Sequence, residues 1–313
     1  MPFDFTLVTA PFRMQPGLRR VASGAPQLTP ARADSRHLRE KMAVLASFPG
    51  QALQVVPGFD AGPVLAAAAA EAARGEPVAF AIDGRGEAHA PLLRWEVRDG
   101  EPQGDGDPAI GALLAALAPS QRATALLCLA FEEDFAVLDG ETSLVPWLAV
   151  CLPSRWAPAD KLGRHFADIH APVADSATLV AASDSLARLV TGYERWERFV
   201  WTISADPKLN QHPAQGRSLW PAEVDAGGLV DLAAFRSERQ TFVPMEGSRC
   251  ALFTIRIESL PLADAIDSPE AARRVHDALA SMSEAVLAYR GLDDARDRLL
   301  AWLAARMTPR SAQ

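Results

Sequence analysis

Six histidines are the side chains of this sequence best suited to binding a metal, and His170 has the most distinctive surroundings. It follows residues 158–169, in which apolar side chains recur at helical spacing and share one face: Leu162, Phe166 and Ile169. Pro172 lies just beyond it and prevents simple continuation of a helix. A neutral imidazole held between apolar walls would be a good axial ligand for heme iron. The alternative is a helix-terminal histidine that bonds local carbonyl groups, and spacing alone does not exclude it.

The sequence lacks the motifs of several common enzyme classes. It contains no Walker loop, no Gly-x-Gly-x-x-Gly turn after a strand, no Gly-x-Ser-x-Gly elbow and no His-Glu-x-x-His helix. The chain is therefore not expected to bind NAD(P)H through a Rossmann unit of its own. Three adjacent acids, Glu132 to Asp134, could form a metal or acid-base cluster. We expect instead that they form a solvated entry to a strand, which is the usual role of such charge runs.

The composition is that of an ordinary globular protein, with 49% hydrophobic and 22% charged residues in a chain of 313. A net charge of -8 and a pI near 5.3 argue against nucleic acid or anionic lipid as partners, because both attract basic surfaces. Residues 1–12 lack the basic and apolar regions of a secretory signal, and no apolar run is long enough to span a membrane. We therefore expect a cytoplasmic protein without a nucleic-acid or membrane partner.

Hydrophobic patterning places His170 between two groups of predicted strands. Strand-length apolar runs precede it at residues 123–130, 135–138 and 146–152 and follow it at 199–203, 229–242 and 251–258. Helices are predicted between the groups at 158–169 and 178–196, and a helical tail at 269–307. Antiparallel strands interrupted by a helical crossover leave a cavity in which an apolar cofactor can be held. The sequence thus predicts an α+β fold with a PAS-like antiparallel sheet and a helical crossover.

The first part of the chain predicts a mixed α/β extension. Helices are expected at 35–45, 62–74 and 109–118, and short strands at 77–82 and 92–97. Residues 104–108 combine small, charged and helix-breaking side chains without an apolar anchor, which makes them the best linker candidate. We therefore predict two domains: an N-terminal α/β extension at 1–107, and a PAS-like core with C-terminal helices at 108–313.

Three linked motifs surround His170. They are Leu152-Pro153-Ser154-Arg155-Trp156, Lys161-Leu162-Gly163-Arg164 and Ile169-His170-Ala171-Pro172-Val173. This series resembles the heme-dependent oxidative N-demethylase alpha-subunit-like family, in which Pro-Ser-x-Trp, Lys-x-Gly and Ile-His-x-Pro-Val segments recur in this order. Other similar segments extend over nearly the whole chain: Phe12-Arg13-Met14, Pro16-Gly17-Leu18, Glu132-Glu133-Asp134-Phe135, Glu238-Arg239-Gln240-Thr241, Leu252-Phe253-Thr254-Ile255-Arg256 and Tyr289-Arg290-Gly291-Leu292. Three linked motifs are far more specific than one histidine.

The resemblance implies a PAS-like domain that holds heme b, activates O2 at the iron and demethylates a small secondary amine such as dimethylamine. Electrons would come from separate reductase subunits that carry FMN and a 2Fe-2S cluster and use NADPH. Heme would supply the oxidising chemistry of this oxidoreductase, and the protein would supply a ligand, a pocket and a path for electrons. Two alternatives are a heme-binding sensor or redox protein without turnover, and a cofactor-free relative that keeps only the fold.

The resemblance also implies roles for individual residues. His170 is expected to be the proximal iron ligand. Arg239 is the leading candidate for a distal cation that polarises dioxygen, and its alternative is a strand arginine paired with an acid. Glu238 would instead hold a substrate ammonium group. Because neighbours on a strand point to opposite faces, we expect only one of these two residues to enter the pocket unless the strand bulges.

Four further residues are candidates for cofactor contact. Lys161 and Arg164 would reach a heme propionate, whereas Arg198 and Trp201 belong to another segment that is similar to the family. For each of them, an exposed or packing role is an equal alternative.

Three positions depart from the family pattern. Val200 stands where the family often has asparagine, Ala174 replaces a common proline, and Phe242 begins a less basic continuation of its segment. If that asparagine contributes to the distal pocket, Val200 would make the pocket more apolar and alter what can bind there.

Overall fold

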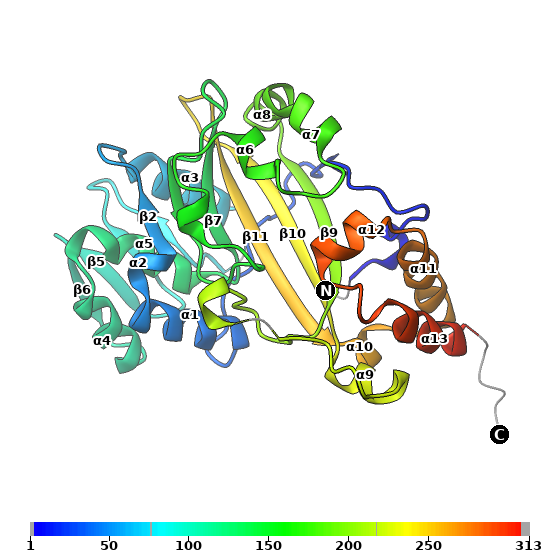
Figure 1. The fold of residues 1–313 in the computed structure, drawn as a ribbon. Helices are drawn as coiled ribbons and strands as arrows, with labels where there is room; N and C mark the ends of the chain where they lie inside the picture. Colours follow the sequence, from blue (N-terminus) through cyan, green and yellow to red (C-terminus); the bar gives the residue numbers. More distant parts are fainter. Residues whose placement is uncertain (1–2, 76, 217, 308–313) are drawn as a thin grey trace.

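The computed structural model describes residues 3–75, 77–216 and 218–307, and it confirms the predicted α+β fold (Figure 1). Its largest element is a seven-stranded antiparallel sheet with the order β1-β9-β10-β11-β7-β8-β2. The strands are β1 (Arg19–Arg20), β2 (Leu53–Val55), β7 (Asp134–Asp139), β8 (Trp147–Ala149), β9 (Trp196–Ser204), β10 (Ala234–Pro244) and β11 (Cys250–Pro261). The long strands β9, β10 and β11 form its centre.

A second, four-stranded antiparallel sheet has the order β3-β4-β5-β6. Its strands are β3 (Ala81–Ile82), β4 (Ala88–Ala90), β5 (Trp95–Arg98) and β6 (Glu101–Gly104). Five helices accompany it in the sequence: α1 (Arg36–Ser47), α2 (Pro49–Ala52), α3 (Gly62–Ala72), α4 (Pro108–Ala116) and α5 (Pro119–Ala130). Together they lie beside the β7 end of the large sheet, on the left of Figure 1.

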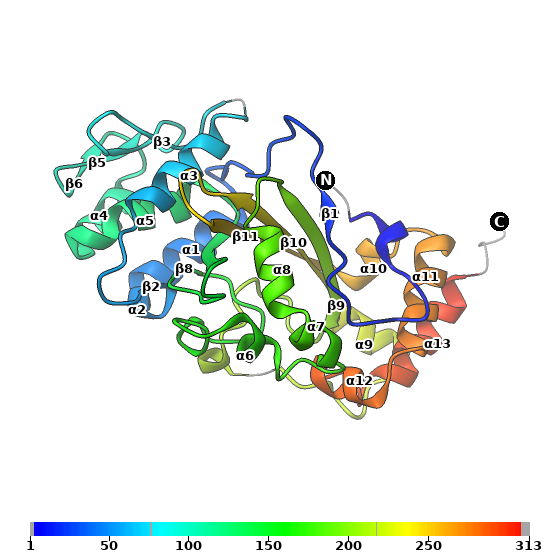
Figure 2. The same ribbon diagram turned by 90° about the horizontal axis from the view of Figure 1, so that it is seen from above.

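The remaining helices lie on the crossover between β8 and β9, between β9 and β10, and after β11. The crossover between β8 and β9 contains α6 (Phe166–His170), α7 (Ala177–Ala181) and α8 (Ser183–Val190). The later helices are α9 (Ala226–Leu232), α10 (Leu262–Ala265), α11 (Pro269–Ala280), α12 (Glu284–Arg290) and α13 (Arg296–Arg306), and single 3-10 turns occur at Phe5–Leu7, Pro158–Asp160 and Pro213–Gln215. Figure 2 shows α8 lying against the sheet, while α11, α12 and α13 cluster beyond β9.

Strands β7 and β8 precede the helical crossover, and β9, β10 and β11 follow it. The helical crossover between two groups of strands agrees with the prediction, although two strands and not the expected three directly precede it. Within the open sheet, β11 pairs with β7. The PAS-like classification and the domain boundary at residue 107 stay predictions.

Alternation along β7 separates two faces of the large sheet. Phe135 and Val137 belong to a core that also includes side chains of α3 and α5, whereas Ala136 and Leu138 belong to a core shared with α8. A third core joins the C-terminal helices to the far parts of β9 and β10, around Trp201 and Phe235. The α8 face of the sheet is the one that carries the cavity described below.

Two glycines show that the chain packs closely in and just after residues 104–108. A Cβ atom on Gly106 would lie 1.9 Å from the carbonyl oxygen of Leu93, and one on Gly111 would lie 2.2 Å from the indole of Trp95. The chain here is therefore pressed against Trp95, and Asp107 caps α4 by accepting a hydrogen bond from Ala109 N at 2.9 Å. The predicted helix at 109–118 is confirmed as α4.

Residues 123–130 were expected to form a strand, and this expectation is wrong. They belong to α5, which starts at Pro119 and is buried almost all round. A continuous apolar run does not distinguish a buried strand from a buried helix, and here Pro119 supplies the helix start.

Several other boundaries differ from the expected ones, three of them in and after the crossover. The helix predicted at 158–169 is interrupted, because Gly163 adopts a left-handed φ of 66° and its N–H binds Val145 O at 2.7 Å. The helix predicted at 178–196 ends at Val190, and β9 begins at Trp196. The first residues of the strand predicted at 229–242 belong to α9, whose N-cap is Asp225.

Candidate functional site

A cavity of about 400 Å³ lies between the α8 face of the large sheet and the segments that follow β8. Its floor comes from β7, β9, β10 and β11, and its walls come from the Ser154–Trp156 segment, α6, α7 and the end of α12. The motifs that surround His170 in the sequence therefore form one side of this cavity. The size is within the range of ligand pockets.

The strand register explains which side chains form the floor. Arg198, Gln240 and Ile255 lie side by side on β9, β10 and β11, and Val200 lies opposite Glu238 in the next row that faces the same way. Directly opposed residues of antiparallel strands share a face, so all five reach the cavity.

The cavity is apolar at one end and polar at the other. The apolar end is lined mainly by Leu138, Val145, Leu148, Phe166, Ile169, Val173, Phe242 and Phe253. The polar end is lined by Ser154, Arg155, Gln211, Arg236, Glu238, Tyr289 and Arg290. Among the described residues that line the whole cavity, five are basic and one, Glu238, is acidic. The cavity therefore suits a largely apolar group that carries anionic substituents.

His170 is the last residue of α6 and lines the cavity. Its Nδ1 atom is 2.7 Å from the carbonyl oxygen of Phe166, and its ring lies 4.1 Å from the Phe166 ring. A carbonyl oxygen can only accept, so Nδ1 carries the proton and the lone pair is on Nε2. Burial, helped by the nearby Arg198 and Lys161, lowers the pKa of His170 to about 4. The imidazole is therefore neutral at physiological pH, with Nε2 available as a ligand atom.

Lys161 and Arg198 lie near enough to His170 to lower its pKa. Lys161 Nζ donates to the carbonyl oxygen of Ile169 at 3.2 Å, and burial lowers the pKa of Lys161. The Nε atom of Arg198 is buried without a hydrogen-bond partner among the residues that the structure describes. Burial also lowers the pKa of Arg198, which the charge of Glu238 partly opposes. An anionic group of a ligand would compensate both cations.

Glu238 is held at the polar end by two neighbours. Ser154 Oγ donates to Glu238 Oε1, and Gln240 Nε2 donates to Oε2 at 2.7 Å. Ser154 Oγ in turn accepts from Arg236 Nη2 at 2.8 Å, and Arg236 is anchored by the carbonyl oxygens of Lys208 and Leu209. The carboxylate of Glu238 is thus fixed in the cavity.

Backbone strain accompanies this arrangement at Arg155, which follows Ser154 directly. Arg155 has a φ of 63°, a left-handed conformation that is unusual for a residue other than glycine. Its N–H donates to the carbonyl oxygen of Gln211, and its Nη1 donates to that of Arg290 at 2.6 Å. These bonds hold the Ser154–Trp156 segment against the polar end.

Arg239 does not line the cavity. It points to the opposite face of the sheet, where Nε donates to Glu197 Oε2 at 2.9 Å and Nη2 donates to Gln27 Oε1 at 2.7 Å. The distal-cation role expected for Arg239 therefore has no support from its position. The expectation that Glu238 and Arg239 do not share a pocket agrees with this placement, because β10 continues through both residues without a bulge.

Of the other expected contact residues, some line the cavity and some do not. Arg164 is exposed and does not line the cavity, whereas Trp201 does so. Val200 lies on the floor beside Glu238, and Phe242 lies at the apolar end. Ala174 packs against the core of the C-terminal helices. The structure thus brings together His170, Lys161, Arg198, Trp201 and Glu238.

Arg236 and Arg290 are cavity residues for which the sequence predicted no role. Arg236 could have been found from the two-residue alternation of a strand, because it lies two positions before Glu238 and shares its face. Arg290 belongs to the Tyr289-Arg290-Gly291-Leu292 segment that is similar to the family, but its place in the cavity depends on the packing of α12 against Trp201.

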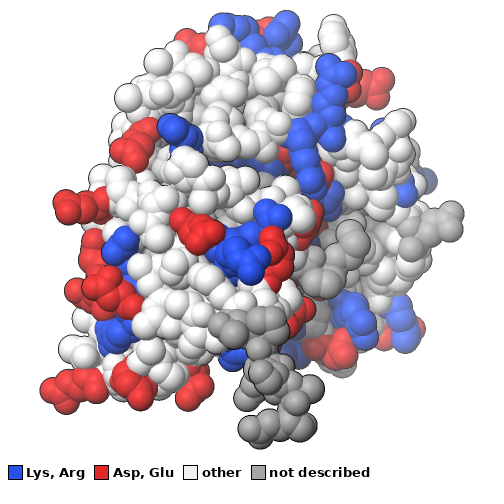
Figure 3. Space-filling model, turned by 90° about the vertical axis from the view of Figure 1, so that its right-hand side faces the viewer, with Lys and Arg blue, Asp and Glu red and all other residues white. Residues whose placement is uncertain are grey.

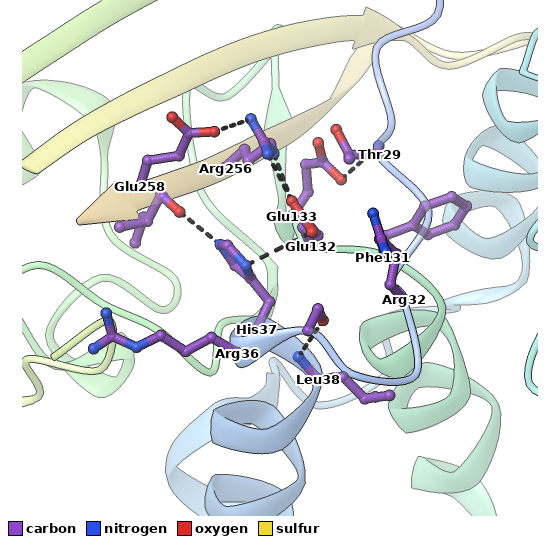
Figure 4. A network of polar contacts seen from close by, with 12 residues as sticks. Thr29, Arg32, Arg36, His37, Leu38, Phe131, Glu132, Glu133, Arg256 and Glu258 are labelled. Carbon is purple, nitrogen blue, oxygen red and sulfur yellow. Dashed lines mark hydrogen bonds and ion pairs between the residues drawn. The ribbon is translucent and has the colours of Figure 1, made fainter. Parts of the chain in front are cut away.

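The acidic run at Glu132, Glu133 and Asp134 is not a solvated strand entry, which corrects the expectation from the sequence. The three residues are buried, with exposed fractions of 8%, 1% and 1%. Figure 4 shows Glu132 bound to Arg256 and His37, and Glu133 bound to Thr29. Asp134 pairs with the fully buried Lys41 at 3.2 Å. The run holds α1 and the N-terminal segment against the sheet, away from the cavity.

A second group of potential ligand atoms lies on the small sheet, where Asp83, Glu87 and His89 approach within 4.8 Å of one another. His89 is already paired with Glu96 at 2.8 Å and lies 3.5 Å from Asp83. Arg98 compensates Glu87 and Glu96. The charges of this group are therefore balanced by protein side chains.

The fold and the site define an α+β protein with a partly apolar cavity, a neutral histidine on its wall and excess positive charge. Residues 112–300 match the family described as Haem-dependent oxidative N-demethylase, alpha subunit-like. The match covers more than half of the 313 residues and includes the cavity-lining segments from β7 to α12, so the chain belongs to this family. The described part of the chain has no helix with the length and apolarity needed to cross a membrane. On the face in Figure 3, basic and acidic side chains are interspersed.

The residues of the cavity fit a heme group on three observations. Nε2 of His170 is a suitable axial ligand, the apolar end can cover a porphyrin, and the buried Nε of Arg198 has no partner among the residues with a described structure. Lys161 and Arg198 would hold its propionates.

Proposed function

We propose that this protein is a heme-dependent monooxygenase-like protein that binds heme b in the cavity and demethylates a small, dimethylamine-like secondary amine with O2. His170 is the observation that carries the proposal. Its neutral imidazole is oriented by the Phe166 carbonyl, lies against apolar side chains and keeps Nε2 available. Hydrogen bonding of Nδ1 to a carbonyl fixes the ring and strengthens its basicity as a ligand, as in many metal sites. The family to which the chain belongs supports the same cofactor.

Heme bound here would supply the oxidative chemistry with O2, and the protein residues would control binding, orientation and water. Lys161 and Arg198 would bind the propionates and thereby fix the porphyrin plane. Phe166, Phe242 and Phe253 would exclude water from the apolar end. A dry environment strengthens every charge interaction inside the cavity.

Glu238 is the residue that we propose for binding the amine. Its carboxylate is fixed by Ser154 and Gln240, so it can orient a protonated amine and accept its proton through either oxygen. Val200 lies opposite Glu238 and presents an apolar surface to the methyl groups of the substrate. Arg239 takes no part, because it binds Glu197 and Gln27 on the other face.

The overall reaction needs a source of electrons outside this chain. One oxygen atom would leave with the methyl carbon as formaldehyde and the other as water, with two electrons supplied by a reductase. We propose separate subunits with FMN and a 2Fe-2S cluster that use NADPH, in agreement with the alpha-subunit-like name of the family. We also propose that the core is PAS-like, that a domain boundary lies near residue 107 and that the protein is cytoplasmic.

The experiment begins with the protein expressed with ample heme and purified. We expect a Soret band, and dimethylamine with O2 and a reducing system should give formaldehyde. The Glu238→Gln variant should retain heme but lose about a hundredfold in kcat/KM, the usual size of a general-base effect. Glu270→Gln is the matched control, because Glu270 is an exposed residue of α11 that pairs with the neighbouring Arg273 and Arg274.

Absence of the Soret band would refute the proposal. Heme without formaldehyde would favour a heme-binding sensor or redox protein. An unchanged rate in Glu238→Gln would remove Glu238 from the reaction while leaving the cofactor assignment intact.

A further inference from the structure

Arg290 is a buried cation that the proposed reaction does not use. It lines the polar end of the cavity, and only 8% of it is exposed. A guanidinium group has five N–H donors. Nη1 donates to the carbonyl oxygen of Trp201, Nη2 is 3.9 Å from the sulfur of Met14, and Nε has no partner among the described residues. Much of its donor capacity is therefore unused.

The position of Arg290 is fixed by several contacts. It ends α12, and Gly291 with a left-handed φ of 63° turns the chain directly afterwards. The guanidinium lies 4.5 Å from the ring centre of Phe12 and 5.6 Å from that of Trp201. Burial lowers the pKa of Arg290 to about 10, so the group stays charged at neutral pH. A rigid, buried cation with unused donors is a strong site for a carboxylate.

Glu238 lies near enough to raise the pKa of Arg290, yet its two oxygens are bound to Ser154 and Gln240. The polar end therefore presents the fixed carboxylate of Glu238 and the fixed guanidinium of Arg290, which do not form a direct ion pair with each other. A zwitterionic ligand with an ammonium and a carboxylate group would satisfy both. A simple dialkylammonium ion would satisfy Glu238 only.

Charge balance supports an additional anion. If the two carboxylates of heme pair with Lys161 and Arg198, the buried Nε atom of Arg290 still has no partner among the described residues. An adjoining polar cavity of about 280 Å³ shares Arg155, Gln211 and Tyr289 with the first and also contains Asp206. A charged ligand would thus meet polar residues on both sides of the polar end.

We infer that the amine substrate carries a carboxylate that binds Arg290, and that the substrate class is N-methylated amino acids rather than simple dialkylamines. The inference rests on the proposed function, in which Glu238 binds the amino group. It gives Arg290 a role in substrate specificity, because a bidentate guanidinium-carboxylate pair distinguishes ligands that differ only in this group.

The test compares N-methylglycine with N-methylglycinamide, which lacks the carboxylate, and with dimethylamine. Binding is measured by ligand-observed NMR on the full-length protein as purified, and heme content is recorded from the Soret band. We expect N-methylglycine to bind at least about tenfold more tightly than the other two, as a single charge-assisted pair provides. This comparison needs no variant, so it stands even where a substitution impairs folding.

Arg290→Gln should remove the preference for N-methylglycine. Arg290→Lys should retain part of the preference, because lysine keeps the positive charge but lacks the paired N–H donors of a guanidinium. The matched control is Arg273→Gln on α11, which is half exposed and pairs with Glu270. It should keep the full preference.

Equal binding of N-methylglycine and N-methylglycinamide, or an unchanged preference in Arg290→Gln, would overturn the inference. Loss of heme from Arg290→Gln with the preference retained would overturn it too, since Arg290 would then serve the propionates. A preference without a Soret band would instead contradict the proposed function alone.

Discussion

The two faces of the large sheet use buried charge in different ways. On the face of Arg239, each cation has an acidic or neutral partner: Arg239 binds Glu197 and Gln27, Arg256 binds Glu132, and Lys41 binds Asp134. On the cavity face, Arg198 and Arg290 keep buried nitrogen atoms without partners in the described chain. Burying an uncompensated charge is costly, so a fold retains it mainly where a ligand completes the pairing.

We therefore assign Arg198 to a ligand site and Arg239 to a structural ion pair. The two residues lie on neighbouring strands, within one register position of each other, but face opposite ways. Lys41 is another buried cation whose charge is compensated within the protein. Burial alone would lower its pKa, but the Asp134 carboxylate and other nearby groups raise it, so its charge is compensated within the protein.

The largest expected difference between the two faces is the one between the variants Arg239→Met and Arg198→Met, in stability and in heme binding. Arg239→Met should lower the free energy of unfolding by about 1–3 kcal/mol, because Glu197 and Gln27 would lose a donor in a buried setting. Arg198→Met should change stability little but weaken heme binding about tenfold. Urea unfolding and heme titration of both variants measure the two effects. Loss of heme affinity in Arg239→Met would contradict the assignment of Arg239 to a structural pair and of Arg198 to the ligand site.

A smaller effect is expected from pH, through His170. Its pKa in the folded protein is about 4, below the ordinary value of 6.5, so the unfolded state binds more protons between these values. The stability that the neutral imidazole contributes is thus complete above about pH 6.5 and is lost as the pH falls toward 4. Wild-type apoprotein should lose stability faster than His170→Gln over this interval, measured by urea unfolding at several pH values. Parallel curves for the two proteins would contradict the buried, neutral histidine.

Local patterns predicted much of this fold, and the exceptions have physical reasons. The helix α11 follows from helical spacing, because its buried residues lie on one face. The strand β10 was recognised although its residues are buried on both faces of the sheet. The apolar run at 123–130 does not reveal its structure, because α5 is buried on nearly all sides and loses the usual polar stripe. Gly163 interrupts the predicted helix through a tertiary contact with Val145.

The candidate site was predictable only in part. The linked motifs led to His170, and strand alternation correctly separated Glu238 from Arg239, but the choice between them required knowing which face carries the cavity. The burial of Glu132 to Asp134 depends on Lys41, His37 and Arg256, which are far away in the sequence. Such long-range partners leave no local signal.

Heme occupancy of His170→Ala, read from the Soret band after purification with ample heme, tests the central claim most directly. His276→Ala is the matched control, because His276 lies on α11 and pairs with Asp277 outside the cavity. The account predicts that heme is lost or strongly reduced in His170→Ala and retained in His276→Ala. Unchanged occupancy and an unchanged spectrum in His170→Ala would contradict it.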